Sequence, residues 1–309
     1  MKDIAFLVLA HTDPVQVGRL CRALDYRARI FVHLDAKTDI RPFLAQPMSE
    51  NVLFIKDRVR VSWAAFSQVE ATLRLMRAAL DSGHEFTHLM MLSGLDYPIK
   101  PLSTLHELLN QQPAHEFIRF IDATRTHYRI YFDHYWFLEA NPALPTRLDR
   151  SIRHGLGRAL RPFLKKPSPA AIGKVCWGSA YWALTSKCAA YILDFADSET
   201  DFVRWARSSF AVDEHFFHTI VGNSEYCAAS DGLFPYQGAN TFQMASLHLV
   251  HESMRKIHTE ADFEALRDSD KFFVRKIVSG QSDRLVERLN AELLNAGASP
   301  AICSDSACK

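Results

Sequence analysis

The sequence predicts a single-domain α/β fold in which helices flank a mostly parallel central sheet. Three observations support this class. The first third of the chain alternates short β-rich runs with helical patterns, the β-rich runs are mostly apolar, and the 309-residue chain is 48% hydrophobic. Strands that are buried on both faces and separated by helices form mostly parallel sheets. The apolar content is enough for a large core, which excludes a disordered chain.

Each element of the first third follows from its residue pattern. The apolar runs at 4–10, 28–35, 51–55 and 87–94 predict strands, and the patterns at 15–24 and 63–80 predict helices. In a parallel sheet of this kind, ligands bind beyond the carboxyl ends of the strands. The loops at 11–14, 35–37 and 93–98 are therefore expected on the ligand side.

The later elements are shorter. We predict a strand at 176–184, a helix at 186–195, a helical stretch opened by Asp213 and Glu214, a helix at 259–266 with Thr259 as its N-cap, and a short strand or helix end at 272–277. Residues 1–296 are expected to form the folded domain. The small and polar residues 297–309 are expected to fray.

Charge, cysteine content and hydropathy exclude several classes of function. The net charge is +1, so no overall field attracts nucleic acid or an anionic membrane. The six cysteines show no CxxC pair and no zinc-ligand spacing, which is typical of free thiols in a reducing compartment. No window reaches the roughly 18 apolar residues that a spanning helix needs. We therefore expect a soluble, cytoplasmic protein that is at most peripheral to the inner face of a membrane.

Six segments, taken in order, carry a resemblance to a known family. The chain resembles the core-2/I-branching β-1,6-N-acetylglucosaminyltransferases and the peptide O-xylosyltransferases, which together form glycosyltransferase family 14. The segments are FVHLDAK at 31–37, SW at 62–63, LSGLDYPI at 92–99, WGSAYW at 177–182, DE at 213–214 followed by FF, and FVRK at 273–276. Each segment is weak alone, and their joint order carries the resemblance. Because no membrane anchor is visible, the chain resembles a bacterial-type member that acts on glycans under construction.

The resemblance implies a GT-A-like fold, a UDP-sugar donor such as UDP-GlcNAc or UDP-xylose, and inversion at the anomeric carbon. It implies a nucleotide-binding half at 1–112 and an acceptor- and diphosphate-binding half at 113–296. No cofactor and no metal ion is expected, because the family does not require an Asp-x-Asp site and the loop at 93–96 offers a single carboxylate, that of Asp96. One carboxylate does not by itself exclude magnesium. The acceptor is expected to be a glycan, a glycolipid or a protein.

Glycosyl transfer needs a base that takes the proton of the acceptor hydroxyl and cations that hold the charge of the departing UDP. By resemblance, Glu214 is the base and Asp213 binds the acceptor. The alternative for this pair is that both acids only cap a helix N-terminus.

The cations come from two late basic stretches. By resemblance, Lys276 contacts the diphosphate, and Arg275 precedes it. A second cation is expected from Arg255 or Lys256, and the spacing does not decide between them. The alternative is that these residues form a solvated basic surface.

Besides these basic residues, four others are expected to contact the donor: His11, Asp35, Lys37 and Asp96. Asp35 resembles the family's uracil or ribose contact, and a turn-forming Asp is the alternative. Trp63 is expected to anchor its helix in the core, with packing under the nucleotide as the alternative.

The acceptor is expected to meet the segment at 177–182. Trp177, Ser179 and Tyr181 pair flat aromatic rings with hydrogen-bonding groups, which suits a sugar face, although a plain aromatic core strand is the alternative. The aromatic stretch at 127–136 is expected to belong to an acceptor-binding insertion.

A basic amphipathic helix is predicted at 147–166. We expect it to form a solvated structural surface. The alternative is contact with an anionic lipid-linked or polysaccharide acceptor at a membrane. The sequence leaves the oligomeric state open.

Two other functions compete with glycosyl transfer. His215 and His218 share a helix face, as in a metallohydrolase, but their spacing matches neither His-Glu-x-x-His nor its inverse. A carbohydrate-binding protein without turnover is the second alternative. The presence of both Glu214 and Lys276 favours the enzyme.

Overall fold

The structure is a computed structural model that describes residues 2–139, 155, 164–169, 172–238 and 241–294. Its main sheet has the strand order β3-β2-β1-β4-β8-β6-β7, and β9 pairs with β6. The strands are β1 (Asp3–Ala10), β2 (Ala28–Leu34), β3 (Val52–Phe54), β4 (Phe86–Ser93), β6 (Glu116–Asp122), β7 (Cys176–Gly178), β8 (Ala183–Thr185) and β9 (Ser230–Phe234). Strands β1 to β4 are parallel, whereas β4, β8, β6 and β7 are joined by antiparallel pairs.

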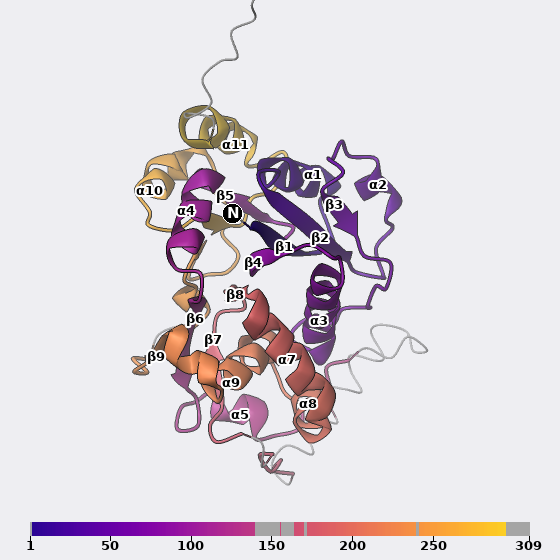
Figure 1. Cartoon of the computed structure of the whole chain (residues 1–309), viewed down its shortest axis with the longest axis vertical. Coiled ribbons are helices and arrows are strands. Elements are labelled where there is room, and N and C mark those ends of the chain that lie inside the picture. The colour runs from indigo at the N-terminus through magenta and orange to yellow at the C-terminus, as the bar shows by residue number, and fades with distance from the viewer. Residues whose placement is uncertain (1, 140–154, 156–163, 170–171, 239–240, 295–309) are drawn as a thin grey trace, which may run out of the picture.

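The core explains why β1 is apolar at nearly every position. Ala5 and Leu7 join a buried cluster with α3 (Phe66–Leu80) and α7 (Ser186–Ser198), whereas Phe6 and Val8 join a second cluster with α1 (Pro14–Ala23) and α4 (Leu102–Gln111). Successive side chains of a strand point to opposite faces, so both faces of β1 are covered. Figure 1 shows α1 and α3 on either side of β1 and β2. The predicted α/β class, with helices on a mainly parallel central sheet, is confirmed.

A second, three-stranded sheet has the order β10-β11-β5. It contains β5 (Asp96–Pro98), β10 (His248–Val250) and β11 (Phe273–Arg275). The antiparallel register of β5 and β11 sets Arg275 opposite Asp96. One side of this sheet packs into a third cluster with α10 (Phe263–Arg267) and α11 (Asp283–Leu289). The late basic pair is thereby held at the loop that follows β4.

The remaining elements are short. They are α2 (Arg41–Leu44), α5 (Arg129–Phe132), α8 (Thr200–Arg207), α9 (Phe216–Gly222), and the helical turns η1 (Val212–Glu214), η2 (Glu225–Ala229), η3 (Thr241–Met244), η4 (Glu260–Asp262) and η5 (Asn290–Leu294). Thr259 forms a capping box with Asp262, which confirms the predicted N-cap.

One predicted strand is wrong as a continuous element. The segment at 176–184 forms two strands, β7 and β8, and the residues between them line a cleft instead of continuing the ladder. Gly178 closes β7 where no side chain fits, because a Cβ there would lie 2.1 Å from the carbonyl oxygen of Arg119. The chain then leaves the sheet, and Ser179 and Tyr181 line the cleft.

Candidate active site

The carboxyl ends of β1, β2 and β4 open into one cleft. The backbone N–H of Asp35 donates to the carbonyl oxygen of Ala10 at 2.9 Å, and that of Gly94 donates to the carbonyl oxygen of Leu9 at 2.8 Å. These bonds hold the three loops side by side. Gly94 is required for this approach, because a Cβ there would lie 2.9 Å from the Val17 side chain. The loops predicted on the ligand side therefore do converge.

The cleft has a volume of about 470 Å³ and is lined from both halves of the chain. It brings together nine residues predicted for the site: His11, Asp35, Lys37, Ser179, Tyr181, Asp213, Glu214, Arg275 and Lys276. Asp96, Trp177, Arg255 and Lys256 do not line it.

Two residues that follow β2 form a fixed polar corner of the cleft. Lys37 Nζ lies 3.2 Å from a carboxylate oxygen of Asp35, and the other oxygen accepts from the backbone N–H of Lys37 at 2.9 Å. Nearby, His33 Nε2 accepts from the backbone N–H of Val59 at 2.8 Å, and burial lowers the pKa of His33 to about 4. A neutral ring is the form that can accept this bond. His11 is exposed at the rim, and partial burial lowers its pKa although Asp35 opposes the shift.

Asp96 does not contact the cleft, which corrects its predicted role as a donor contact. Its side chain is 0% exposed, and its carboxylate accepts from the Ser93 backbone N–H at 2.7 Å and from the Ser93 hydroxyl at 2.6 Å. Arg275 Nη1 lies 3.4 Å from the same carboxylate and donates to Ser93 Oγ. Burial alone would raise the pKa of Asp96, but hydrogen bonding by His248 and the charge of Arg275 hold it below its usual range. The buried carboxylate of Asp96 therefore holds the Arg275 side chain in position.

Lys276 and Arg255 differ from Lys37 and Arg275, which pair with Asp35 and Asp96. Neither Lys276 nor Arg255 forms an ion pair with a carboxylate in the described part of the chain. Burial and then the charges of Arg275 and Arg255 lower the pKa of Lys276. These cations repel one another, so an anion between them would relieve the repulsion.

The two candidates for the second cation are separated by their partners. Lys256 Nζ lies 2.5 Å from a carboxylate oxygen of Asp262 and borders a different cavity. Arg255 is exposed, follows the cleft-lining Met254, and acts electrostatically on Lys276. The geometry therefore favours Arg255 over Lys256.

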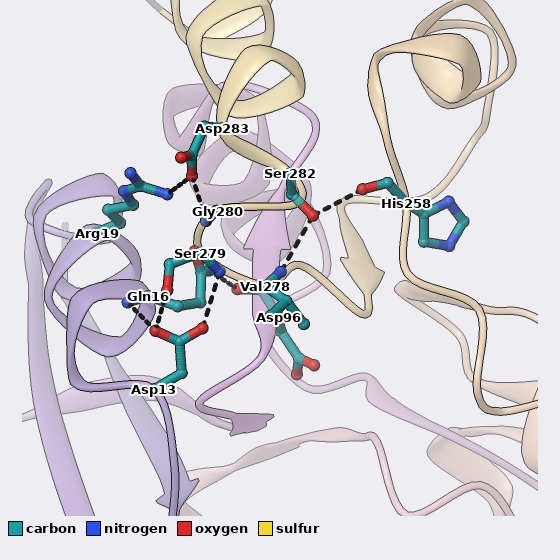
Figure 2. A network of polar contacts seen from close by, with 10 residues as sticks. All are labelled: Asp13, Gln16, Arg19, Asp96, His258, Val278, Ser279, Gly280, Ser282 and Asp283. Carbon is teal, nitrogen blue, oxygen red and sulfur yellow. Dashed lines mark hydrogen bonds and ion pairs between the residues drawn. The ribbon is translucent and has the colours of Figure 1, made fainter.

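A polar clamp holds the loop after Lys276 against the start of α1. The carboxylate of Asp13 accepts from the backbone N–H of Gln16 at 3.0 Å and from the backbone N–H and hydroxyl of Ser279 at 2.8 and 2.6 Å. Arg19 pairs with Asp283 at 2.5 Å, and Figure 2 shows both contacts bridging the two segments. The clamp fixes the basic loop relative to the loop that carries His11.

The acidic pair Asp213 and Glu214 also lines the cleft, from turn η1. Both side chains are half-buried. Burial raises the pKa of Asp213 to about 6. Burial, followed by the charge of Asp213, raises the pKa of Glu214 to about 8. Because the two carboxyl groups interact, they lose their protons in two steps, and the pKa of each step is a property of the pair and not of one residue. A carboxyl with a raised pKa in a cleft is suited to accept a proton near neutral pH.

Trp177 lies behind Glu214, which corrects its predicted role as a sugar-stacking surface. The ring is 1% exposed and packs against Tyr128, Tyr131 and His215. Its Nε1–H donates to Glu214 Oε2 at 3.0 Å. The predicted aromatic insertion thus supplies rings that support the acidic pair. Tyr128, Tyr131 and Trp136 do not line the cleft.

Ser179 and Tyr181 do face the cleft. Tyr181 stacks on His248 with ring centroids 4.5 Å apart, and the Arg275 guanidinium lies 5.9 Å from its ring. Tyr181 therefore lies beside the basic residue Arg275, and the charge of Asp213 also acts on it.

The sequence places Trp63 wrongly and does not single out Gln68, although both residues line the cleft. Trp63 is 75% exposed and lines the cleft, so its expected place in the core is wrong.

Gln68 also lines the cleft, and its Nε2 donates to Asp213 Oδ2 at 3.0 Å while its Oε1 accepts from the backbone N–H of Ala64. Gln68 thus ties Asp213 to the loop that carries Trp63. A polar residue in the first turn of a cleft-side helix is the only signal the sequence offers for it.

The predicted basic helix at 147–166 falls largely outside the described residues. Its last residue, Lys166, is buried, and its Nζ donates to the Trp205 carbonyl oxygen at 2.6 Å and to Ser209 Oγ at 2.7 Å. Burial lowers the pKa of Lys166 to about 7. The expectation of a solvated surface is therefore wrong for Lys166.

Among the described residues, no helix combines the length and apolar content needed to cross a bilayer.

Comparison with known proteins points to one family. Among the relatives, a mouse β-1,3-galactosyl-O-glycosyl-glycoprotein β-1,6-N-acetylglucosaminyltransferase 4 is 23% identical over 71% of this chain and 46% of its own length. A bovine β-1,3-galactosyl-O-glycosyl-glycoprotein β-1,6-N-acetylglucosaminyltransferase is 24% identical over 70% of this chain and 48% of its own. The chain thus spans about half the length of the curated relatives it matches. The crystal structure of mouse xyloside xylosyltransferase 1 in its apo form aligns with a TM-score of 0.36 and 12% sequence identity. The alignment covers 88% of this chain and 97% of that structure. A likeness this weak carries no inference about the present chain.

The family match covers most of the chain. Residues 4–232 match the family described as Core-2/I-Branching enzyme. This stretch includes the three loops at the strand ends, the acidic pair and the aromatic rings behind it. The chain therefore belongs to the Core-2/I-branching enzyme family.

Proposed function

We propose that this chain is a GT-A-like, inverting glycosyltransferase that moves N-acetylglucosamine or xylose from a UDP-sugar to a hydroxyl of a glycan, glycolipid or protein. The observation that carries the proposal is that Glu214 and Lys276, which has no ion-pair partner among the described residues, line the same cleft. A base and a cationic group on opposite sides of a sugar-sized space are what the reaction requires. Family membership supports the same activity.

In the proposed reaction, Glu214 takes the proton of the acceptor hydroxyl. The acceptor oxygen forms a bond to the anomeric carbon on the face opposite UDP, and the bond from that carbon to the UDP oxygen breaks. UDP leaves with the electron pair, and the negative charge that develops on its diphosphate is stabilised by Lys276, Arg275 and Arg255. Asp35 and Lys37 bind the nucleoside end. Ser179, Tyr181 and Asp213 contact the acceptor.

The donor set supports a mechanism without a required metal ion. Asp96, the single carboxylate of the 93–96 loop, is fully buried and bonded to Ser93 and Arg275, so it offers no oxygen to a cation in the cleft. The Asp35 carboxylate is paired with Lys37. A hard cation on diphosphate would want such oxygens. Fixed cations take that place in the proposal, so transfer is expected to persist in EDTA.

The proposed function is tested by binding and turnover with a panel of donors. Thermal shift with UDP, UDP-GlcNAc, UDP-xylose and UDP-glucose identifies the donor, and released UDP with sugar acceptors measures transfer. We expect UDP and one UDP-sugar to raise the melting temperature. We expect NMR to show a β-linked product from the α-linked donor. If neither UDP nor any UDP-sugar stabilises the protein, the proposal is wrong.

Reversing the charge of Lys276 is expected to weaken UDP binding. Lys276→Glu places an anion beside the diphosphate, so we expect at least about a tenfold loss of affinity at low salt, which corresponds to about 1.4 kcal/mol. The difference from wild type should shrink at high salt, because ions screen the interaction. Isothermal titration calorimetry at two salt concentrations measures both effects. Lys187→Glu, an equal charge change at an exposed position of α7, is the control; equal affinities in all three proteins would remove Lys276 from the site.

The pH dependence of transfer is expected to have an acidic limb. Glu214 acts as a base only when it is deprotonated, and its pKa is raised to about 8. The value of kcat/KM should therefore fall by about tenfold per pH unit below that ionisation and level off above it. Initial rates are measured from about pH 5.5 to about pH 9, an interval that includes this pKa, in buffers of constant ionic strength. A fall in kcat/KM toward acid would show the expected limb. A rate independent of pH in this range would contradict a carboxylate base with a raised pKa.

A further inference from the structure

We infer that Trp177 is a positioning residue that holds the Glu214 carboxylate so that Oε1 takes the acceptor proton. This inference deepens the proposed function and rests on it for its catalytic meaning. The contact that carries it is the 3.0 Å hydrogen bond from Trp177 Nε1 to Glu214 Oε2. An indole N–H only donates, so the direction of this bond does not depend on a tautomer or on a rotating hydroxyl. The bond therefore assigns different roles to the two oxygens of the carboxylate.

The remaining oxygen has no competing partner. Among the described residues, Glu214 makes no other side-chain hydrogen bond and no ion pair. Oε2 is occupied by the indole, and Oε1 belongs to a side chain that lines the cleft. Only Oε1 is thus available to an acceptor hydroxyl without breaking a protein contact.

The indole is held rigidly enough to fix its partner. Its ring centroid lies 4.8 Å from that of Tyr128 in a stacked arrangement and 5.2 Å from that of His215. Tyr128 is itself fixed, because its hydroxyl accepts from Thr241 Oγ1 at 3.2 Å. A ring packed on neighbouring aromatic side chains cannot follow a carboxylate that rotates away. The orientation of Glu214 is therefore set by the packing behind it.

The bond also acts on the charge of Glu214. Burial and the charge of Asp213 raise the pKa of Glu214, and the hydrogen bond from Trp177 opposes them. A donor to the ionised carboxylate favours the ionised form. Without the indole N–H, the base would be protonated over more of the neutral range.

Trp177→Phe removes the N–H and keeps an aromatic ring. A hydrogen bond to a charged group contributes enough that its loss should lower kcat by about tenfold to a hundredfold. KM for the donor should stay near the wild-type value, because Trp177 lies behind the cleft. The acidic limb of the pH profile should move to higher pH by about one unit or more. A structural defect alone would not shift this limb.

Trp205→Phe is the matched control. Trp205 is also buried and also packs on His215, but its Nε1 has no hydrogen-bond partner in the described part of the chain. Removing this N–H should leave kcat and the pH profile close to wild type. If Trp177→Phe is folded and keeps the wild-type kcat and acidic limb, or if both variants lose activity alike, the inference is overturned.

A second measurement does not depend on turnover. In protein labelled with ¹⁵N at its five tryptophans, the indole signal of Trp177 is the one missing from the Trp177→Phe spectrum. We expect this signal to shift with pH as Glu214 ionises, and we expect Glu214→Gln to abolish the shift. A signal independent of pH in the wild type would overturn the inference. A shifting signal in a protein that transfers no sugar would support the contact and refute only the proposed function.

Discussion

Replacement of Glu214 by glutamine is expected to lower the rate of sugar transfer by about 10²–10⁴ while UDP still binds. Glutamine has the same shape, and its amide oxygen can still accept from Trp177 Nε1. It cannot take a proton from the acceptor hydroxyl. The loss should therefore appear in kcat under saturating donor and acceptor, with little change in the affinity for UDP.

Folding is not expected to account for this loss. Because burial disfavours the charge of Glu214, a neutral side chain should leave the melting temperature equal to or above that of the wild type. Glu225→Gln, at an exposed position of turn η2, makes the same chemical change outside the cleft and should retain full activity. A Glu214→Gln variant that keeps more than about a tenth of the wild-type turnover would refute the role of Glu214 as base.

The parts of the site that could be predicted from the sequence lie at strand ends. Asp35 follows a mostly apolar strand, and a parallel sheet places that end beside the ends of its neighbours whatever the rest of the chain does. Asp213 and Glu214 open a helical stretch, and this local feature also holds. The resemblance to a family supplied the partnership of Glu214 with Lys276, which no local pattern could give.

The aromatic residues of the site could not be placed in this way. Trp63 precedes a helix and Trp177 lies in an apolar segment, so their patterns favour neither core nor cleft. The outcome depends on distant contacts: Trp63 meets Phe210 edge to face at 5.6 Å, whereas Trp177 is covered by rings from residues 128–131. Side chains far apart in the sequence decide which ring is exposed.

A single sequence likewise does not show which charged residues will pair in the interior of the fold. Asp96 follows a strand, as Asp35 does, and the sequence predicts the same role for both. The register of β5 against β11 sets it opposite Arg275, and only that pairing turns a candidate ligand contact into a support for a cation. Its contribution should therefore appear mainly in stability.

Replacing Asp96 with asparagine is expected to lower the free energy of unfolding by about 3–5 kcal/mol, the usual effect of removing one partner of a buried ion pair. The change leaves the charge of Arg275 without its acidic partner. It also faces an amide group toward Ser93, whose backbone N–H and hydroxyl both donate to the carboxylate. Because Arg275 then loses its anchor at the cleft, UDP binding should weaken as well.

Urea unfolding at pH 7 measures the loss, and its pH dependence tests the cause. The folded-state pKa of Asp96 is lowered, so the stabilisation by its charge is complete above the unfolded-state pKa of about 3.9 and disappears as the pH falls through the lower folded-state pKa. The gap between wild type and Asp96→Asn should therefore narrow in acid. Asp39→Asn, in a surface pair with Arg41, should leave the unfolding midpoint nearly unchanged. If Asp96→Asn unfolds within about 1 kcal/mol of the wild type, the buried carboxylate does not hold Arg275 in place, and the basic wall of the cleft must be organised by the Asp13–Ser279 clamp alone.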